Sequence, residues 1–224
     1  MKAVIIAGGK GTRLGKLTEE IPKPMLQLVG KPLMEYHIDL LKRYGITDIF
    51  VTVNYLKDSI INHFGNGERF GVNIKYYEEK EPLGTAGGVK ALENELGNDF
   101  LVVYGDVLVE MNISKLIEFH QIQKSSATLV LHPNDHPHDS DLVAVDMNDK
   151  ITGFIAKPQE KGKYYANLVN AGIYILNRQV LNFVEANKKA DFGADIFPHL
   201  VNQDRKSTRL NSSHIQKSRM PSSA

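Results

Sequence analysis

Residues 2–14 read KAVIIAGGKGTRL, and this stretch decides the fold. The run from 2 to 7 is apolar after its first residue and ends at two glycines, which is typical of a central strand buried on both faces that leads into a loop. In the loop, Gly8, Gly9 and Gly11 let backbone N–H groups approach an anion closely. Arg13 adds a planar fork for phosphate oxygens. The stretch therefore predicts a phosphate-binding loop at the end of a central strand.

Other readings of this loop fit its residues less well. A dinucleotide-binding fingerprint needs a third glycine, and Leu14 stands in its place. A P-loop needs a Gly-Lys-Ser/Thr ending, which the loop lacks. A plain tight turn is the remaining alternative, but three glycines with two cations at a strand end favour anion binding.

Outward from this stretch, apolar runs alternate with helical patterns up to residue 203. The fold class predicted is α/β, a Rossmann-like three-layer α/β/α domain with a mostly parallel mixed sheet and ligands at the carboxyl ends of its strands. Thr85 and Ser114 are the expected N-caps of their helices. Strands are predicted at 48–53, 72–77, 100–104, 128–131 and 172–176, a hairpin at 142–155, and helices at 32–44, 56–64, 85–96, 114–123, 178–186 and 194–201.

Composition narrows the class of protein. The 224 residues are 42% hydrophobic, enough for one sizeable core. They include no cysteine, which excludes disulfides, thiolate metal sites and a thiol nucleophile. The first apolar run is too short for a signal peptide or a membrane span. We therefore expect a soluble cytoplasmic protein that does not bind a membrane.

The composition changes at residue 204. The segment 204–224 holds five basic residues and one acidic residue, which leaves residues 1–203 with a net charge of −3. A basic arm for nucleic acid and a disordered terminus are two interpretations. We favour a third, because the residues 204–207, DRKS, are what the start of a common sequencing adapter encodes. We expect a domain at 1–203, a non-native disordered tail at 204–224, and no nucleic-acid partner.

Lys23 and Asp106 are the next candidates. Prolines on both sides of Lys23 stiffen the chain, so this lysine can meet a phosphate with little loss of entropy. A solvated surface lysine would be the better interpretation were the glycine loop not close by. Asp106 follows the strand 100–104 and is expected at the carboxyl-end crevice, where Mg²⁺ on a triphosphate needs a carboxylate. A Gly-Asp pair alone is more often a turn.

Two further segments contain polar or glycine-rich patterns. Residues 81–88, EPLGTAGG, form a second glycine-rich turn at a helix start, whose backbone could read the edge of a base. Between 132 and 142, three histidines with nearby aspartates could hold a metal, but Pro133 and Pro137 break any helical spacing of ligands. A polar substrate-binding loop is the favoured interpretation.

Together these residues resemble the sugar-1-phosphate nucleotidyltransferase family, and most closely its mannose- or heptose-1-phosphate guanylyltransferase-like branch. The resemblance covers residues 1 to about 203. It rests on GGKGTRL at 8–14, PKPML at 22–26, GKP at 30–32, PLGTAG at 82–87, GD at 105–106 and NAGIY at 170–174.

The resemblance implies a role for each candidate residue. Arg13, Lys23 and Asp106 would be catalytic, with Arg13 on the departing pyrophosphate, Lys23 near the α-phosphate and Asp106 on the Mg²⁺ cofactor. Nucleotide contacts are implied for Ala7, Gly8, Gly9, Gly11, Thr12, Glu81, Gly84, Thr85 and Ala86, and sugar-phosphate contacts for Asp141, Lys157, Asn170 and Gly172.

The reaction implied joins an NTP to a sugar 1-phosphate, giving an NDP-sugar and pyrophosphate, in nucleotide-sugar biosynthesis for surface polysaccharide. GTP with mannose or heptose 1-phosphate is favoured, and uridylyl or thymidylyl transfer to glucose 1-phosphate is an alternative. The nucleophile is already an anion, so no general base is needed. A catalytically silent regulatory relative is the rival from another class. The oligomeric state is left open, a homo-oligomer included.

Two departures from the family pattern matter. Ala156 stands where many relatives carry a glutamate before Lys-Pro, and we expect Asp141 to supply a substitute carboxylate. Relatives usually have a second metal-binding aspartate in a late Asp-x-Gly-Thr segment, which does not occur here before the tail. We therefore expect a truncated enzyme with weakened Mg²⁺ binding and severely reduced turnover.

Overall fold

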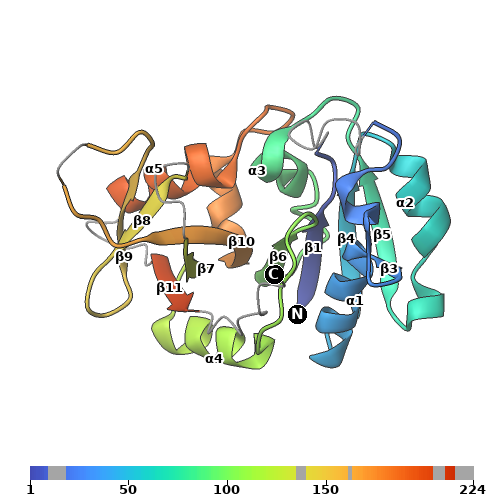
Figure 1. The fold of residues 1–224 in the computed structure, drawn as a ribbon, viewed down its shortest axis with the longest axis horizontal. Coiled ribbons are helices and arrows are strands. Elements are labelled where there is room, and N and C mark those ends of the chain that lie inside the picture. The colour runs from blue at the N-terminus through green and yellow to red at the C-terminus, as the bar shows by residue number, and fades with distance from the viewer. Residues whose placement is uncertain (10–18, 135–139, 161–162, 204–209, 215–224) are drawn as a thin grey trace, which may run out of the picture.

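The computed structural model describes residues 1–9, 19–134, 140–160, 163–203 and 210–214, and these form a nine-stranded sheet covered by helices (Figure 1). A separate two-stranded ribbon joins β2 (Gln27–Leu28) to β3 (Lys31–Pro32). The sheet strands are β1 (Lys2–Ile6), β4 (Asp48–Val53), β5 (Asn73–Glu78), β6 (Asp99–Tyr104), β7 (Ala127–Pro133), β8 (Leu142–Val145), β9 (Ile151–Ile155), β10 (Leu168–Asn177) and β11 (Leu210–His214).

The sheet is mixed and its centre is parallel. Its order is β11-β7-β10-β6-β1-β4-β5, and β8 and β9 are attached through β10. β1 pairs in parallel with β4 on one side and with β6 on the other, and β5 continues in parallel from β4. β10 runs antiparallel to both β6 and β7. The predicted mostly parallel mixed sheet is confirmed.

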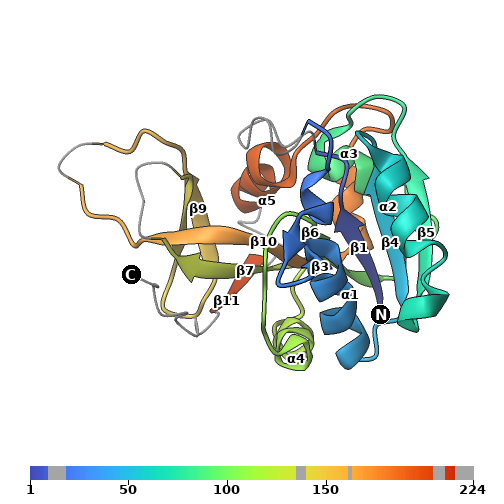
Figure 2. The ribbon, with the colours of Figure 1, turned by 45° about the vertical axis from the view of Figure 1, so that its right-hand side comes forward.

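Helices cover both faces of this sheet. They are α1 (Leu33–Arg43), α2 (Lys57–Phe64), α3 (Gly84–Lys90), α4 (Ile113–Gln123) and α5 (Phe197–Gln203). Ala3 and Ile5 of β1 pack in the core that also contains residues of α1, α2 and α4, whereas Val4 packs in the core formed with α3 and α5. Figure 2 shows α1 and α2 lying over β1 and β4. Alternate side chains of one apolar strand thus enter two cores, as the three-layer prediction requires.

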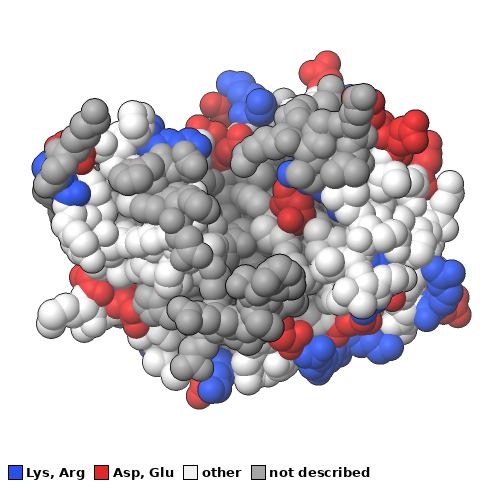
Figure 3. Space-filling view, viewed as in Figure 1, with Lys and Arg blue, Asp and Glu red and all other residues white. Residues whose placement is uncertain are grey.

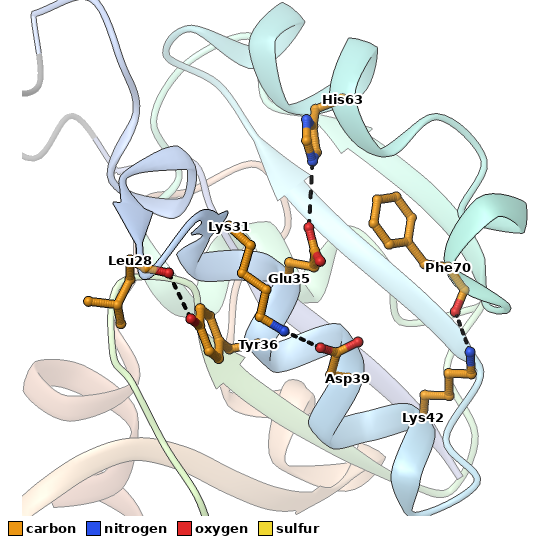
Figure 4. Close-up of polar contacts among 8 residues, drawn as sticks. All are labelled: Leu28, Lys31, Glu35, Tyr36, Asp39, Lys42, His63 and Phe70. Carbon is orange, nitrogen blue, oxygen red and sulfur yellow. Dashed lines mark hydrogen bonds and ion pairs between the residues drawn. The ribbon is translucent and has the colours of Figure 1, made fainter.

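Polar contacts fasten α1 to its neighbours (Figure 4). Tyr36 donates a hydrogen bond of 2.7 Å to Leu28 O in the β2–β3 ribbon. Lys42 donates one of 2.9 Å to Phe70 O, and His63 Nε2 lies 3.8 Å from Glu35. Lys31 also forms an ion pair with Asp39. The ribbon directly follows residues 23–25, so α1 helps to fix the segment that contains Lys23.

Three local elements differ from the sequence prediction. α3 ends at Lys90 rather than at residue 96, and the residues after it form turns, with Leu92 N donating to Val89 O. α4 begins after Asn112, whose side chain accepts from the Lys115 amide, so the expected Ser114 cap is wrong. Two irregular helices occupy the late helical region, a 3-10 helix at Arg178–Phe183 and a π-helix at Phe192–Ile196.

Residues 210–214 form β11, which pairs in parallel with β7 at the edge of the sheet. This strand lies inside the segment 204–224, for which the sequence predicts disorder, and these five residues differ from that expectation. Within the described ranges, no helix is both long enough and apolar enough to cross a membrane.

Candidate active site

The candidate site begins where β1 and β6 end. The chain goes from β1 to β4 and β5 on one side and returns to β6 on the other, which makes the β1/β6 boundary a topological switch point where a crevice forms. Ala7 N donates to Thr52 O and Gly105 N donates to Ile6 O, each at 2.9 Å, so the ladder continues to the edge. A Cβ at Gly105 would lie 2.9 Å from Ile6 O, too close for a side chain. The turns after both strands are therefore held side by side.

The predicted phosphate loop leaves this edge. Ala7 is buried and Gly8 is partly buried beside Asn54 and Glu79, while Gly9 is exposed. Gly11, Thr12 and Arg13 lie outside the described residues, and their predicted contacts stay predictions.

Lys23 and Asp106 meet at the same edge. Lys23 begins a 3-10 helix, Lys23–Met25, with the buried Pro24 packed toward Gly105. Lys23 Nζ lies 3.0 Å from Asp106 Oδ2, and the two side chains are 22% and 41% exposed. Because both groups remain accessible to solvent, the pair contributes little to stability. A cation and a carboxylate are thus available together at the crevice.

His37 holds the turn that contains Asp106 through a hydrogen bond to its backbone. This residue of α1 is buried, and its Nε2 bonds to Val107 O. The carbonyl can only accept, so Nε2 carries the hydrogen. Nδ1 has no partner among the described atoms. Burial lowers the pKa of His37, which keeps the ring neutral.

Glu79 is a buried carboxylate that the sequence analysis did not single out. It follows β5 and is 9% exposed. Its Oε2 accepts from Leu83 N at 3.1 Å and closes the turn before α3. A Cβ on Gly8 would lie 3.6 Å from Oε1, and one on Gly88 only 2.3 Å. Burial raises the pKa of Glu79, and the bond from Leu83 opposes that rise.

The second glycine turn is held by a distant loop. The residue at the N-cap of α3 is Leu83, and its side chain makes no cap bond, so the expected Thr85 cap is wrong. Asp191 Oδ1 instead accepts from Thr85 N at 3.1 Å, and Ala190 O accepts from Ala86 N at 2.8 Å. Gly84 has a φ of +73° and packs against Ala190 O, while Ala86 is fully buried and Glu81 is exposed.

A cavity of about 610 Å³ opens beside this turn. Its lining includes Asp141, Lys157 and Asn170, three of the four predicted sugar-phosphate residues, together with Thr85 and Asp191. The fourth, Gly172, lies behind the lining with a φ of +74°, and its amide donates to Asn170 Oδ1 at 2.9 Å.

Asp141 contacts the predicted phosphate-binding lysine. Its Oδ1 accepts from the Lys157 backbone amide at 3.0 Å, so the carboxylate fixes the turn that presents this lysine. His132 and Asn134 also line the cavity, as a polar substrate-binding loop would. His136 and His138 lie outside the described residues. In the part of the chain that the structure describes, no three histidine or carboxylate side chains form a metal cluster.

Charges of both signs are interspersed over the face seen in Figure 3, which is the face of Figure 1.

The site combines a carboxylate–lysine pair, a glycine turn and a polar cavity with its own lysine. This set of groups is suited to two phosphorylated substrates.

Comparison with known proteins identifies the family of the chain. Residues 2–214 match the family model described as Nucleotidyl transferase, and the chain belongs to this family. It is 35% identical over 215 residues to a UTP–glucose-1-phosphate uridylyltransferase of Synechocystis sp., with 90% of this chain and 55% of that protein aligned. It is 36% identical to mannose-1-phosphate guanyltransferase 2 of Candida glabrata, with 91% and 57% aligned. The chain thus spans a little over half the length of these curated relatives.

A solved structure is similar over nearly the whole chain. HddC from Yersinia pseudotuberculosis, in complex with GMP-PN, superimposes with a TM-score of 0.77 at 25% identity and covers 96% of this chain and 90% of its own. The family and the fold implied by the sequence motifs are both confirmed.

Sequence reasoning did not single out Glu79, Asp191 or Tyr104. Glu79 follows β5 and Tyr104 ends β6, so strand position was a usable signal for both. Asp191 lies far along the chain from β1, and no short-range pattern connects it to that strand. Tyr174 is part of the NAGIY motif at 170–174, but the sequence assigns no role to its side chain.

Proposed function

We propose that this protein is a sugar-1-phosphate nucleotidyltransferase that joins an NTP to a sugar 1-phosphate. The observation that carries the proposal is the Lys23–Asp106 pair at the β1/β6 crevice, next to a cavity that contains Asp141, Lys157 and Asn170. We assign the first group of residues to the nucleotide and the second to the sugar phosphate. Membership of the nucleotidyl transferase family supports the same reaction.

The chemistry requires positioning more than acid–base catalysis. A phosphate oxygen of the sugar 1-phosphate attacks the α-phosphorus, the bond to the bridging oxygen of the β-phosphate breaks, and pyrophosphate leaves with that electron pair. Lys23 would neutralise charge at the α-phosphate, and Lys157 would hold the attacking phosphate. The attacking oxygen is already ionised, so no side chain has to remove a proton.

Asp106 fits a Mg²⁺ ion. Mg²⁺ usually keeps several waters and takes one or two carboxylates together with substrate phosphates, and an exposed carboxylate at the crevice meets that need. When bound, the ion would neutralise charge on the triphosphate. Lys23, already 3.0 Å from the same carboxylate, would be held beside those phosphates.

For the substrates, we propose GTP with mannose or heptose 1-phosphate. Glu79 Oε2 already accepts from Leu83 N, which leaves Oε1, beside Gly8, as the acceptor for a base. A guanine base presents two adjacent N–H donors that suit this acceptor, whereas uracil and thymine present one N–H between two carbonyls. The similarity to a Candida glabrata mannose-1-phosphate guanyltransferase and to a structure solved with GMP-PN favours the same base. We place the reaction in the cytoplasm, in nucleotide-sugar synthesis for surface polysaccharide.

The test is a matrix of GTP, UTP, dTTP and ATP against mannose, heptose and glucose 1-phosphates, with the 224-residue chain and Mg²⁺. Pyrophosphate release and formation of the NDP-sugar are measured together. We expect both products with GTP and mannose or heptose 1-phosphate. Turnover only with UTP or dTTP and glucose 1-phosphate would overturn the substrate proposal, and nucleotide binding without product from any pair would favour a silent regulatory relative.

Glu79→Gln tests the base assignment separately. Glutamine keeps an oxygen that can accept from Leu83 N, so the turn before α3 stays closed while one acceptor facing the base becomes a donor. We expect the ratio of kcat/KM for GTP to that for UTP to fall by at least about tenfold, the cost of one mismatched hydrogen-bonding group. An unchanged ratio would contradict the role of Glu79.

A further inference from the structure

Hydrogen bonds of Thr85 join the turn before α3 to the loop at 190–192, and Thr85 and Asp191 both line the cavity. Thr85 Oγ1 donates to Asp191 Oδ1 at 3.1 Å, and the same carboxylate oxygen accepts from Thr85 N at 3.1 Å. In another part of the lining, Asn170 Nδ2 donates to Tyr174 OH at 2.6 Å.

The Thr85 hydroxyl is used in both directions. A threonine hydroxyl has one hydrogen and two lone pairs. Its hydrogen goes to Asp191, and its oxygen accepts from Phe192 N at 2.9 Å. The Thr85 hydroxyl therefore has no hydrogen left to donate to the phosphate oxygens of a nucleotide.

Further bonds fix the backbone around Thr85. Ala190 N donates to Leu83 O at 2.9 Å, and Ala190 O accepts from Ala86 N at 2.8 Å, so the turn before α3 is joined to the 190–191 loop. In another part of the lining, Asn170 Oδ1 holds the amide of Gly172. The turn proposed for the nucleotide is therefore joined through Thr85 to the loop that contributes Asp191 to the sugar-phosphate cavity.

We propose that Thr85 is a positioning residue whose hydroxyl sets the nucleotide turn and the sugar-phosphate cavity at a fixed separation, rather than a residue that binds the nucleotide through its side chain. This inference rests on the proposed function. A misplacement of reacting groups by about 1 Å can cost roughly a hundredfold in rate without a matching loss of binding.

The test compares Thr85→Val with Thr128→Val. Thr128 is fully buried, and its hydroxyl, like that of Thr85, bonds to a side chain, His120 Nδ1 at 2.8 Å, but it lies outside the cavity. We expect Thr85→Val to lower kcat about 10- to 100-fold, with less than about a threefold change in either KM, and Thr128→Val to leave kcat within about twofold. Thr85→Ser restores the hydroxyl and should recover most of kcat.

Three outcomes would overturn the proposal. The first is a Thr85→Val kcat like that of Thr128→Val. The second is a loss confined to the KM of the NTP, which would mean that the hydroxyl binds the nucleotide directly. The third is no recovery in Thr85→Ser. If Thr85→Val does not fold, Thr85→Ala removes the same hydroxyl with a smaller side chain, and the same split between kcat and KM is expected.

Hydrogen exchange gives a readout without turnover. Exchange in the segment 190–196 should accelerate at least about tenfold in Thr85→Val and stay unchanged in Thr128→Val, because the bond from Phe192 N is lost only in the first variant. A wild-type protein that neither binds an NTP nor forms product would refute the proposed function, while equal exchange in both variants would refute the role of Thr85.

Discussion

Asp141→Asn is the sharpest test of sugar recognition. Asp141 Oδ1 accepts from the Lys157 amide at 3.0 Å, and an asparagine oxygen can accept the same bond, so the substitution removes the charge alone. A hydrogen bond from a sugar hydroxyl is worth about 1.5–3 kcal/mol to a charged acceptor and about 0.5–1.5 kcal/mol to a neutral one. Asp141 is exposed, so screening by solvent makes the difference in energy between the charged and the neutral acceptor small, about 1 kcal/mol.

A loss of about 1 kcal/mol corresponds to a rise of roughly fivefold in the KM of the sugar 1-phosphate, with kcat and the KM of the NTP unchanged. Initial rates of pyrophosphate release over a grid of both substrates measure all three constants. Asp141→Ala also removes the bond to Lys157 and should raise the same KM further. An unchanged KM in Asp141→Asn would refute the idea that the charge of Asp141 binds a sugar hydroxyl. An unchanged KM in both variants would show that Asp141 has no part in binding the sugar 1-phosphate.

Three more predictions concern the metal, pH and packing. Asp106→Asn should lower activity or Mg²⁺ affinity about 10- to 100-fold, measured by Mg²⁺ titration of pyrophosphate release, and an unchanged titration would contradict the metal assignment. Burial lowers the pKa of His120 in the folded protein, so the unfolded chain takes up the proton first as the pH falls. The stability that comes from the neutral histidine is therefore complete above about pH 6.5 and is lost below it, by up to about 1.4 kcal/mol per pH unit. His120→Gln should therefore lose less stability than wild type between pH 7 and 5.5 in urea unfolding, and equal losses would count against this. Gly172→Ala forces a side chain at φ +74° to within 3.0 Å of the Tyr104 ring, which should cost about 2–4 kcal/mol and lower Tm by about 5–15 °C. Gly153→Ala, where a Cβ meets nothing within 4 Å, is the matched control, and similar Tm values for the two variants would be the contrary result.

The central sheet could be predicted from the sequence because β1, β4 and β6 are covered on both faces. A strand in that position has to be apolar at nearly every residue, and such runs are visible without a structure. The crevice followed from the same pattern, since parallel strands bring their carboxyl ends to one edge. That edge is where Lys23 and Asp106 lie.

The contacts of side chains around α3 could not be predicted in this way. Glu79 and Glu81 stand two residues apart in a polar stretch, and only the turn geometry decides that Glu79 is buried beside Gly8 while Glu81 is exposed. Thr85 looked like a helix cap because local rules favour it there. The cap comes instead from Asp191, 106 residues later, and no local pattern contains that pairing.

This separation along the chain also determines the order in which the protein can assemble. During synthesis, β1, β4, β5 and β6 are all complete before residue 191 exists, so the first half can form its sheet while the amides at the start of α3 have no acceptor. Closing a contact over so many residues is slow compared with local structure. The turn proposed to hold the nucleotide is therefore among the last parts of the molecule to become ordered.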